Sequence, residues 1–241
     1  MFFSPLEQFD ILVLFNFLGF NIVNIVIFFF LLGFTFFLFY FFFNSKLFYI
    51  NIFQNIFEMV YLFIIDMLNQ QVGSYGIKYF PFFFFIFFFI LLSNLIGMLP
   101  FSFTLTAHLS ITFFLAFSFN IGLIILGFVL NGYKFLYLFK PAGTPVFLLP
   151  LIIVIEIVCY LIRTFSLSIR LFANMMAGHC PLFVISSFVF GLLNSSIVFI
   201  IPIFFIYFAV FCLEFSIAFL QAYVFTILLS IYLNDSLHPV H

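Results

Sequence analysis

Arg170 is the residue of this chain whose setting points most strongly to chemistry. It lies in the segment SLSIRLFANMMAGH, within a chain that is 68% hydrophobic and 5% charged. A guanidinium stays protonated at any ordinary pH. Placing it at bilayer depth costs on the order of 3 kcal/mol or more, so intramembrane arginines usually mark an ion or proton pathway. The alternative is an arginine near a helix end that extends to the head groups. Arg163, Asn174 and His179 make the polar stretch too long for one interfacial end, which favours a functional arginine.

The spacing around this arginine is helical. Glu156, Arg163 and Arg170 recur at intervals of seven residues. Two turns of helix return to nearly the same direction, so the three side chains are expected on one face within about 40°. Asn174, one turn beyond Arg170, extends that face. The sequence therefore predicts one polar stripe along an otherwise apolar helix.

A second polar stripe lies near the C-terminus. Glu214 and Gln221 are also seven residues apart, and Asp235 lies about 60° from their line on a helix. Two such stripes packed together could hydrate each other and leave proton-accessible notches on either side of the arginine. His179, nine residues after that arginine, falls on the nominally opposite side of its helix. It therefore serves a different compartment, or the helix bends near Gly178.

Several of these residues also have plainer interpretations. Glu156 and Arg163 could form a simple ion pair, and buried ion pairs are weak evidence for function. His179 and Glu214 could share a structural hydrogen bond, although a hydrated histidine is a competent proton carrier. His108, in a short loop, is expected to be an exposed surface residue.

Composition defines the class of protein. The mean hydropathy of +1.44 and the long continuous apolar runs indicate an integral helical membrane protein, because in lipid only helices or closed barrels satisfy the backbone. Six Lys+Arg against seven Asp+Glu leave no basic surface for a nucleic acid. The three cysteines lie in apolar segments without metal-binding or redox spacing. We therefore expect no metal, no cofactor and no nucleic-acid partner.

The lengths of the apolar runs, and the polar residues that separate them, predict the helices that position these residues. We expect one all-α integral membrane domain over residues 1–241. An amphipathic helix in the membrane interface is expected where polar residues recur with helical spacing, before a glycine-containing break. The expected elements are a spanning helix at 11–43 (its hydrocarbon part beginning near Ile22), the interfacial helix at 51–70, a spanning pair at 80–99 and 109–130, and two inclined helices at 146–180 and 195–233.

The last two helices are too long for ordinary spans. Between Pro150 and Pro181 lie 30 residues, and the run from Pro202 to Leu233 is similar. Each would be roughly 45 Å long, whereas the hydrocarbon core is about 30 Å thick. An average tilt of about 20° absorbs little of this excess. A steeply inclined hairpin, with its polar side facing protein or water, accounts for both the length and the charges.

The lysines orient the chain. They fall in the connections after the first span, before the second and after the third, whereas Glu7 and Asp10 precede the first span. By the positive-inside rule the N-terminus is outside and the C-terminus inside. The four lysines are Lys46, Lys78, Lys134 and Lys140.

Four segments together resemble a known family. The segments are NLIGMLPFSFT, PAGTPVFLLPLIIVIE, SLSIRLFANMMAGH and LEFSIAFLQAYVFTILLSIYLND. They closely resemble the F-type ATP synthase subunit a family in its mitochondrial form, over a stretch from about Asn94 to the C-terminus. The segment SPLEQFD at the start resembles plant and protist members. The family fold has one spanning helix, an interfacial helix, a spanning pair and a long inclined hairpin curved around a rotor ring.

The resemblance implies roles for the residues around the arginine. Arg170 would be the essential arginine that faces the ring carboxylate, and Gln221 would contact it from the last helix. Asn174 matches a polar position next to the arginine. Arg163 falls where relatives vary, so the resemblance gives it no defined role.

The resemblance also implies a proton path. His179 and Glu214 would line a half-channel open to the intermembrane space, and Glu156 and Asp235 a half-channel open to the matrix. The chain would then be a non-catalytic, proton-conducting stator subunit of the membrane sector Fo. Its partners would be a ring of hairpin subunits, other stator and membrane subunits, and the lipid bilayer. A histidine at position 179 fits the mitochondrial branch, which implies the mitochondrial inner membrane.

Three other functions stay open from the sequence. Sodium coupling is one, because the oxygen ligands for Na⁺ would come from the ring. A purely structural subunit of a respiratory or import complex is another, and it predicts only a packing penalty for a neutral residue at Arg170. A self-contained secondary transporter would be expected to carry internal repeats, and we find none in the sequence.

Overall fold

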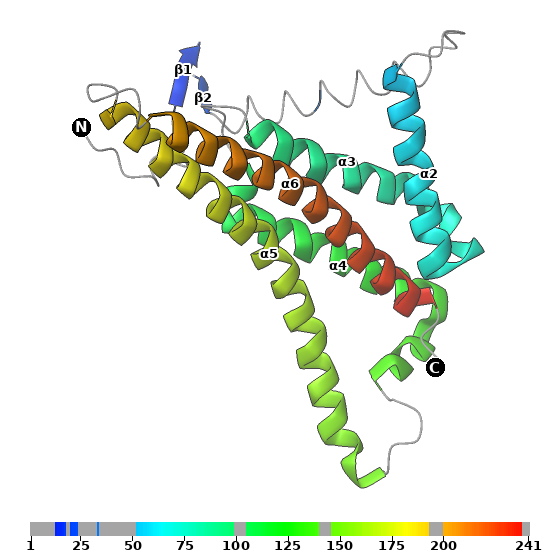
Figure 1. The fold of residues 1–241 in the computed structure, drawn as a ribbon. Helices are drawn as coiled ribbons and strands as arrows, with labels where there is room; N and C mark the ends of the chain where they lie inside the picture. The colour runs from blue at the N-terminus through cyan, green and yellow to red at the C-terminus, as the bar shows by residue number, and fades with distance from the viewer. Residues whose placement is uncertain are drawn as a thin grey trace. The chain divides into compact units, whose positions relative to one another are not determined.

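The computed structural model describes residues 13–17, 20–23, 33, 52–98, 105–139, 146–192 and 200–237. This part of the chain is almost wholly helical (Figure 1), as predicted. Short 3-10 turns, η2 (Ser74–Tyr79), η3 (Leu105–Ala107), η4 (Gly132–Phe139) and η5 (Val146–Leu148), adjoin the longer helices. The α-helices are α2 (Ile52–Val72), α3 (Phe80–Gly97), α4 (Leu109–Asn131), α5 (Leu149–Leu192) and α6 (Ile200–Leu237).

The N-terminal segment differs from the helix expected at 11–43. Two short strands, β1 (Val13–Phe17) and β2 (Phe20–Val23), pair antiparallel with Asn16 opposite Asn21. Val, Ile and Phe favour extended backbone, and asparagine is a poor helix former, so this stretch satisfies its backbone by strand pairing. Gly33 is helical, and the rest of the expected span lies outside the described residues.

Four helical segments are long and apolar enough to cross a membrane, among the residues that the structure describes. The helix α2 is not one of them. Its Ile64, Leu68 and Val72 are buried at spacings of four residues, while Glu58 is exposed. At Gly73 φ is +76°, which ends α2 as the glycine-containing break predicts. The spanning candidates are Ser74–Gly97, Leu109–Asn131, Leu149–Val189 and Pro202–Leu237.

The expected end of the first inclined helix at residue 180 is wrong. The helix α5 continues through Pro181 to Leu192. A proline inside a helix costs about 3 kcal/mol. Leaving the helix in an apolar environment costs several kcal/mol for each unsatisfied backbone group. The second cost exceeds the first, so the helix continues. Part of the connection after α4 is also helical, because η4 (Gly132–Phe139) follows α4 directly.

The chain divides into two compact units, which we describe separately. The first unit comprises residues 1–49, 88–108 and 171–222, and the second comprises residues 50–87, 109–170 and 223–241. A single membrane domain over residues 1–241 stays a prediction. In the first unit Ala107, Met175 and Ala218 form a buried cluster. In the second unit the fully buried side chains include Phe83, Phe225 and Leu229.

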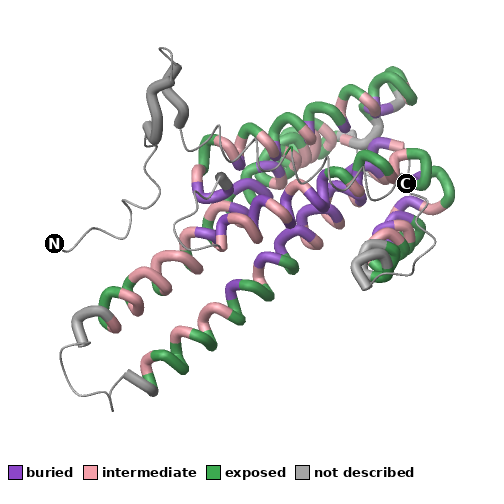
Figure 2. The backbone as a smooth tube through the Cα atoms, turned by 90° about the horizontal axis from the view of Figure 1, so that it is seen from above, coloured by how far each residue is buried: buried purple, intermediate pink, exposed green. Residues whose placement is uncertain are grey.

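Burial is uneven along α5 and α6. No residue is buried over 176–189 of α5 or over 202–213 of α6, whereas buried residues recur along α6 from Glu214 onward. Figure 2 shows these stretches in pink and green next to the undescribed link. The parts of α5 and α6 nearest that link therefore leave their surface for lipid or for another subunit.

Candidate functional site

In the first unit, the structure brings His179 of α5 and Glu214 of α6 together. The distance from His179 Nδ1 to Glu214 Oε1 is 3.3 Å, and the side chains are only 12% and 3% exposed. Neither carboxylate oxygen of Glu214 accepts a hydrogen bond from a described residue. This histidine–glutamate pair is an ion pair when the imidazole is protonated. Because both members titrate, it can also hold a proton without a permanent charge.

Gly178 explains how His179 reaches α6. A Cβ on Gly178 would lie 2.7 Å from Glu214 Oε1 and 3.0 Å from Glu214 Cδ, too close for two non-bonded atoms. The missing side chain leaves room for the glutamate directly against the backbone of α5, and His179 then contacts that glutamate from the next position.

About one turn before Gly178, the two polar stripes meet through a hydrogen bond between amides. Asn174 Nδ2 donates a hydrogen bond to Gln221 Oε1 at 2.7 Å. Gln221 is 3% exposed, and its Nε2 is buried without a hydrogen bond to any described residue. The amide of Gln221 is therefore fixed by one end and retains a donor for another group.

A third helix contributes to the first unit. Asn94 of α3 is fully buried and its Nδ2 approaches the backbone oxygen of Ala218 at 3.5 Å. Ala218 lies one turn from both Glu214 and Gln221, so Asn94 contacts α6 between its two polar residues. The sequence analysis did not select Asn94.

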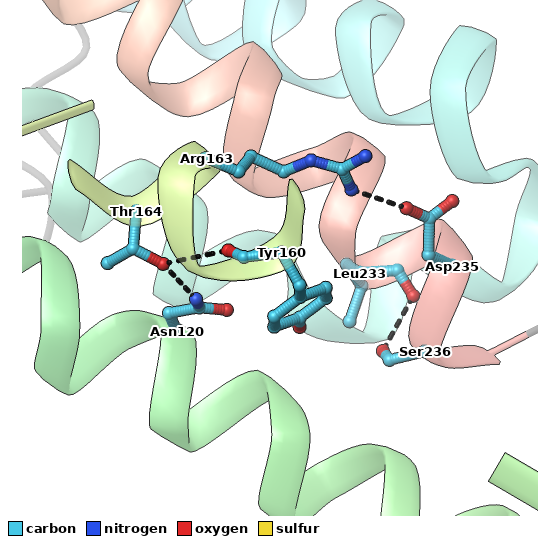
Figure 3. A network of polar contacts seen from close by, with 7 residues as sticks. All are labelled: Asn120, Tyr160, Arg163, Thr164, Leu233, Asp235 and Ser236. Atoms are coloured by element: carbon cyan, nitrogen blue, oxygen red, sulfur yellow. Dashed lines mark hydrogen bonds and ion pairs between the residues drawn. The ribbon is translucent and has the colours of Figure 1, made fainter. Parts of the chain in front are cut away.

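In the second unit, Arg163 and Asp235 form an ion pair. Arg163 Nη1 donates to Asp235 Oδ2 at 3.2 Å, and the side chains are 36% and 27% exposed. The guanidinium carbon also lies 4.9 Å from the ring centre of Tyr232 and 5.9 Å from that of Tyr160. This arginine–aspartate pair is therefore flanked by two aromatic rings, one from each helix. Figure 3 draws the pair together with Tyr160. The pairing of Arg163 with Asp235 replaces the simple Glu156–Arg163 pair that the sequence allowed.

Arg170 is in a different state from Arg163. It is half-buried, and it makes no hydrogen bond or ion pair with a described residue. A cleft of about 280 Å³ lies beside it, with one wall from each of α5 and α6. The guanidinium therefore keeps its donors for a group outside the described residues. The cleft is lined by Arg163, Ser166, Arg170, Leu228, Ile231 and Tyr232.

Two other residues that the sequence singled out, Glu156 and His108, take part in neither of these two pairs. Glu156 is half-buried on α5, two turns before Arg163, and makes no ion pair with a described residue. His108 is half-buried as well, with its Nε2 atom buried, so the expectation of an exposed surface residue is wrong. It lies between η3 and α4 in the chain and directly follows the buried Ala107. The contact of Gln221 with Arg170 stays a prediction.

Some residues that contact the polar stripes do not belong to the stripes themselves, and the sequence pattern did not identify them as functional. Tyr160 and Tyr232 each lie three residues before a member of the arginine–aspartate pair, a helical spacing that could have pointed to them. Asn94 carried no such signal, because its role depends on which faces of two helices meet. Gly178 was named only as a place where the helix could bend, and not as a contact site for Glu214.

Comparison with known proteins identifies the family. The family profile described as "ATP synthase A chain" matches residues 22–234. The chain is similar to ATP synthase subunit a of Acanthamoeba castellanii, with 45% identity over 258 aligned residues and 100% of each chain covered. It is similar to ATP synthase subunit a of Xanthobacter autotrophicus, at 43% identity over 248 residues and 99% of each chain. A third relative, ATP synthase subunit a of Chondrus crispus, is 42% identical over 243 residues, covering 97% of this chain and 96% of its own. The chain therefore belongs to the ATP synthase subunit a family: it is a multi-pass membrane protein, the non-catalytic, proton-conducting stator subunit of Fo, and works with the c-ring and other Fo subunits.

Proposed function

We propose that this chain passes protons to and from the carboxylates of the rotor ring through two offset half-channels, with Arg170 separating them. The observation that carries the proposal is the contrast between two arginines on one helix face. Arg163 is paired with Asp235, whereas Arg170, seven residues later, is half-buried beside a cleft without a partner among the described residues. A half-buried guanidinium that no described residue neutralises is suited to a carboxylate brought by another subunit.

The histidine–glutamate pair serves proton uptake. Protons from the intermembrane space reach Glu214 and His179 and pass to a ring carboxylate. Both side chains can bind and release a proton. The adjoining stretches 176–189 of α5 and 202–213 of α6 contain no buried residue. Once protonated, the ring carboxyl is neutral, so it can travel through lipid without the cost of a buried charge.

Proton release takes place on the matrix side, near Glu156 and Asp235. When a protonated ring carboxyl arrives at Arg170, the fixed positive charge favours the ionised carboxylate, and the proton leaves toward the matrix. The same cation repels a hydrated proton and so prevents a direct path between the half-channels. The membrane potential supplies about 2.3 kcal/mol per charge for every 100 mV.

In this proposal the amides of Asn174 and Gln221 position the ring carboxylate. The hydrogen bond from Asn174 fixes one end of Gln221 and leaves the other end, Nε2, as a donor. Gln221 is thereby available as a second donor to the ring carboxylate that Arg170 binds. In this role the amide selects the position of the carboxylate and adds no charge.

The length of α5 and α6 supports a steeply inclined hairpin. Their apolar segments comprise 41 and 36 residues, which is about 60 and 54 Å of helix against a hydrocarbon core of about 30 Å. We place the chain in the mitochondrial inner membrane, with α2 in the interface, the N-terminus toward the intermembrane space and the C-terminus toward the matrix. The lysine pattern supports this orientation.

The experiment that tests the proposal is Arg170→Ala in the complete ATP synthase. The complex should assemble, because the lost side chain forms no hydrogen bond or ion pair with a described residue. ATP-driven proton pumping and proton-driven ATP synthesis should both be abolished, while passive proton leak persists or rises. Arg170→Lys should fail too, because an ammonium cannot donate in a fork to a carboxylate and Gln221 at once.

Arg163→Gln is the matched control. It removes the same charge from the same helix face, but from a position already paired within the chain, so part of the coupled activity should remain. Normal coupled synthesis in an assembled Arg170→Ala complex would refute the proposal.

A further inference from the structure

The helix α4 carries two amides that reach across to different helices. Asn120 Nδ2 donates to the hydroxyl oxygen of Thr164 on α5. Asn131 Nδ2 donates to the backbone oxygen of Ser236 on α6 at 2.6 Å. The two α4 amides are eleven residues apart, so they lie within about 20° of each other on the helix and about 16 Å apart along it. One face of α4 therefore contacts both helices of the second unit by hydrogen bonds.

Both acceptors directly adjoin the arginine–aspartate pair. Thr164 follows Arg163 in the sequence, and Ser236 follows Asp235. Figure 3 shows Asn120 and Thr164 on one side of this network and Asp235 with Ser236 on the other. Each of the two α4 amides thus holds the backbone segment that carries one member of the ion pair.

The hydrogen bond of Asn120 is a buried one. Asn120 is 7% exposed and Thr164 is 3% exposed. Thr164 in turn approaches the backbone oxygen of Tyr160, one turn earlier on α5, at 3.5 Å. An amide or hydroxyl that loses its partner in such a place stays desolvated, so the contact favours one register of α4 against α5.

The contact of Asn131 has a different basis. Ser236 is the last residue but one of α6, so its backbone oxygen has no partner within the helix. The Ser236 hydroxyl is used locally and donates to the backbone oxygen of Leu233 at 2.7 Å. Asn131, the last residue of α4, therefore donates a hydrogen bond to a carbonyl oxygen that has no partner within α6.

Apolar packing alone would not fix these positions. Phe113 of α4 packs against Phe165 of α5 with ring centres 5.0 Å apart, a contact that tolerates sliding and rotation. The ion pair does not tolerate them. It consists of one hydrogen bond of 3.2 Å between half-exposed side chains, and a shift of about 1 Å would break it.

We propose that α4 is a positioning element for the arginine–aspartate pair, with Asn120 holding α5 beside Arg163 and Asn131 holding α6 beside Asp235. The inference rests on the proposed function, in which Asp235, the acid of this pair, belongs to the matrix half-channel. The two α4 amides touch neither the ring nor the proton. They act through the geometry of the pair.

The test uses inverted membrane vesicles that contain the complete ATP synthase, whose matrix side faces the bath. The rate of ATP-driven proton pumping is measured against bath pH for Arg163→Gln, Asn120→Leu, Thr164→Val and the Asn120→Leu/Thr164→Val double variant. Thr164→Val keeps the shape of the side chain and removes the hydroxyl. Thr164→Ser restores the hydroxyl, and Ser118→Ala removes an exposed α4 hydroxyl that bonds only within its own helix.

Arg163→Gln is expected to move the pH profile. Asn120→Leu and Thr164→Val should move it in the same direction, with a rate change of about two- to tenfold at the most sensitive pH, the range for one hydrogen bond. The double variant should match the larger single effect, and neither change should add to Arg163→Gln. Asn131→Leu should behave in the same way toward Asp235→Asn. Thr164→Ser and Ser118→Ala should retain the original profile.

The outcomes separate the two proposals. If Arg163→Gln moves the profile while Asn120→Leu and Thr164→Val only lower the amount of complex or scale the rate equally at every pH, α4 has a merely structural role and the inference is wrong. Effects that add fully to Arg163→Gln would also overturn it. If Arg163→Gln and Asp235→Asn leave the profile unchanged, the place of this pair in the matrix half-channel fails, and with it the premise of the inference.

Discussion

The two polar pairs formed between α5 and α6 differ in burial and in permanent charge. The histidine–glutamate pair is nearly buried, with side chains 12% and 3% exposed, and both of its members can be neutral. The arginine–aspartate pair is 36% and 27% exposed and contains a cation that stays charged at any ordinary pH. One pair is placed against a glycine backbone, the other between two tyrosine rings.

This difference indicates different tasks. A buried pair of titratable groups can accept and pass on a proton, because its charge changes with protonation. In a pair with a permanent cation, the carboxylate lies beside a positive charge that does not change with pH. Arg170 is a third case, a permanent cation without a partner among the described residues. The sequence places it between Arg163 and His179 on the same helix.

Among substitutions around these two pairs, Gly178→Val is expected to lower the rate of ATP-driven proton pumping most. The new side chain would occupy the position of the Glu214 carboxylate, since even a Cβ would lie 2.7 Å from Oε1. Separating the histidine–glutamate pair and filling the space around it should slow ATP-driven proton pumping about tenfold or more, the equivalent of roughly 1.4 kcal/mol. The loss should exceed that of Glu214→Gln, for which His179 and water partly substitute.

Two variants sharpen this prediction. Gly122→Ala adds a methyl group at a helical glycine with nothing within 4 Å, so it should leave pumping unchanged. Gly178→Ala combined with Glu214→Asp should be better than Gly178→Ala alone, because the shorter acid makes room for the methyl group. Wild-type pumping by the Gly178→Val complex would show that the histidine–glutamate contact is not needed.

A smaller effect is expected from the aromatic contact of the other pair. Tyr232→Leu removes the ring 4.9 Å from the guanidinium of Arg163, whereas Tyr232→Phe retains it. A cation–π contact contributes about 0.5–1 kcal/mol at an exposed site, so Tyr232→Leu should lower the pumping rate about two- to fivefold. Tyr232→Phe should stay close to wild type. Equal losses in both variants would assign the effect to the hydroxyl and not to the ring.

The residues of the polar stripes could be predicted from the sequence, because seven-residue spacing is a property of a single helix. Glu156, Arg163 and Arg170 needed only the helical repeat, and α5 provides it. The contact between His179 and Glu214 was allowed as a structural hydrogen bond, although the helical repeat places His179 on the side of its helix opposite Arg170. Gly178 resolves that conflict, since it lets the glutamate approach the backbone.

Other features depend on how helices meet, which a single sequence does not contain. Asn120 lies in an apolar run of α4 and gains its importance only because Thr164 faces it. The continuation of α5 past Pro181 depends on the cost of leaving a helix in an apolar environment, which outweighs the local signal of proline. The strands β1 and β2 were missed because apolar length was taken as evidence for helix throughout 11–43.

The central claim, two half-channels that open on opposite sides of Arg170, is tested most directly by sided labelling of introduced cysteines. Cys159, Cys180 and Cys212 would first be replaced, because all three are free thiols and two of them are exposed. Single cysteines at Glu214 or Ser216 should then react with a small hydrophilic thiol reagent added outside the inner membrane, and cysteines at Glu156 or Asp235 with reagent added from the matrix side. Labelling of the 214 and 156 cysteines from the same side would contradict the account.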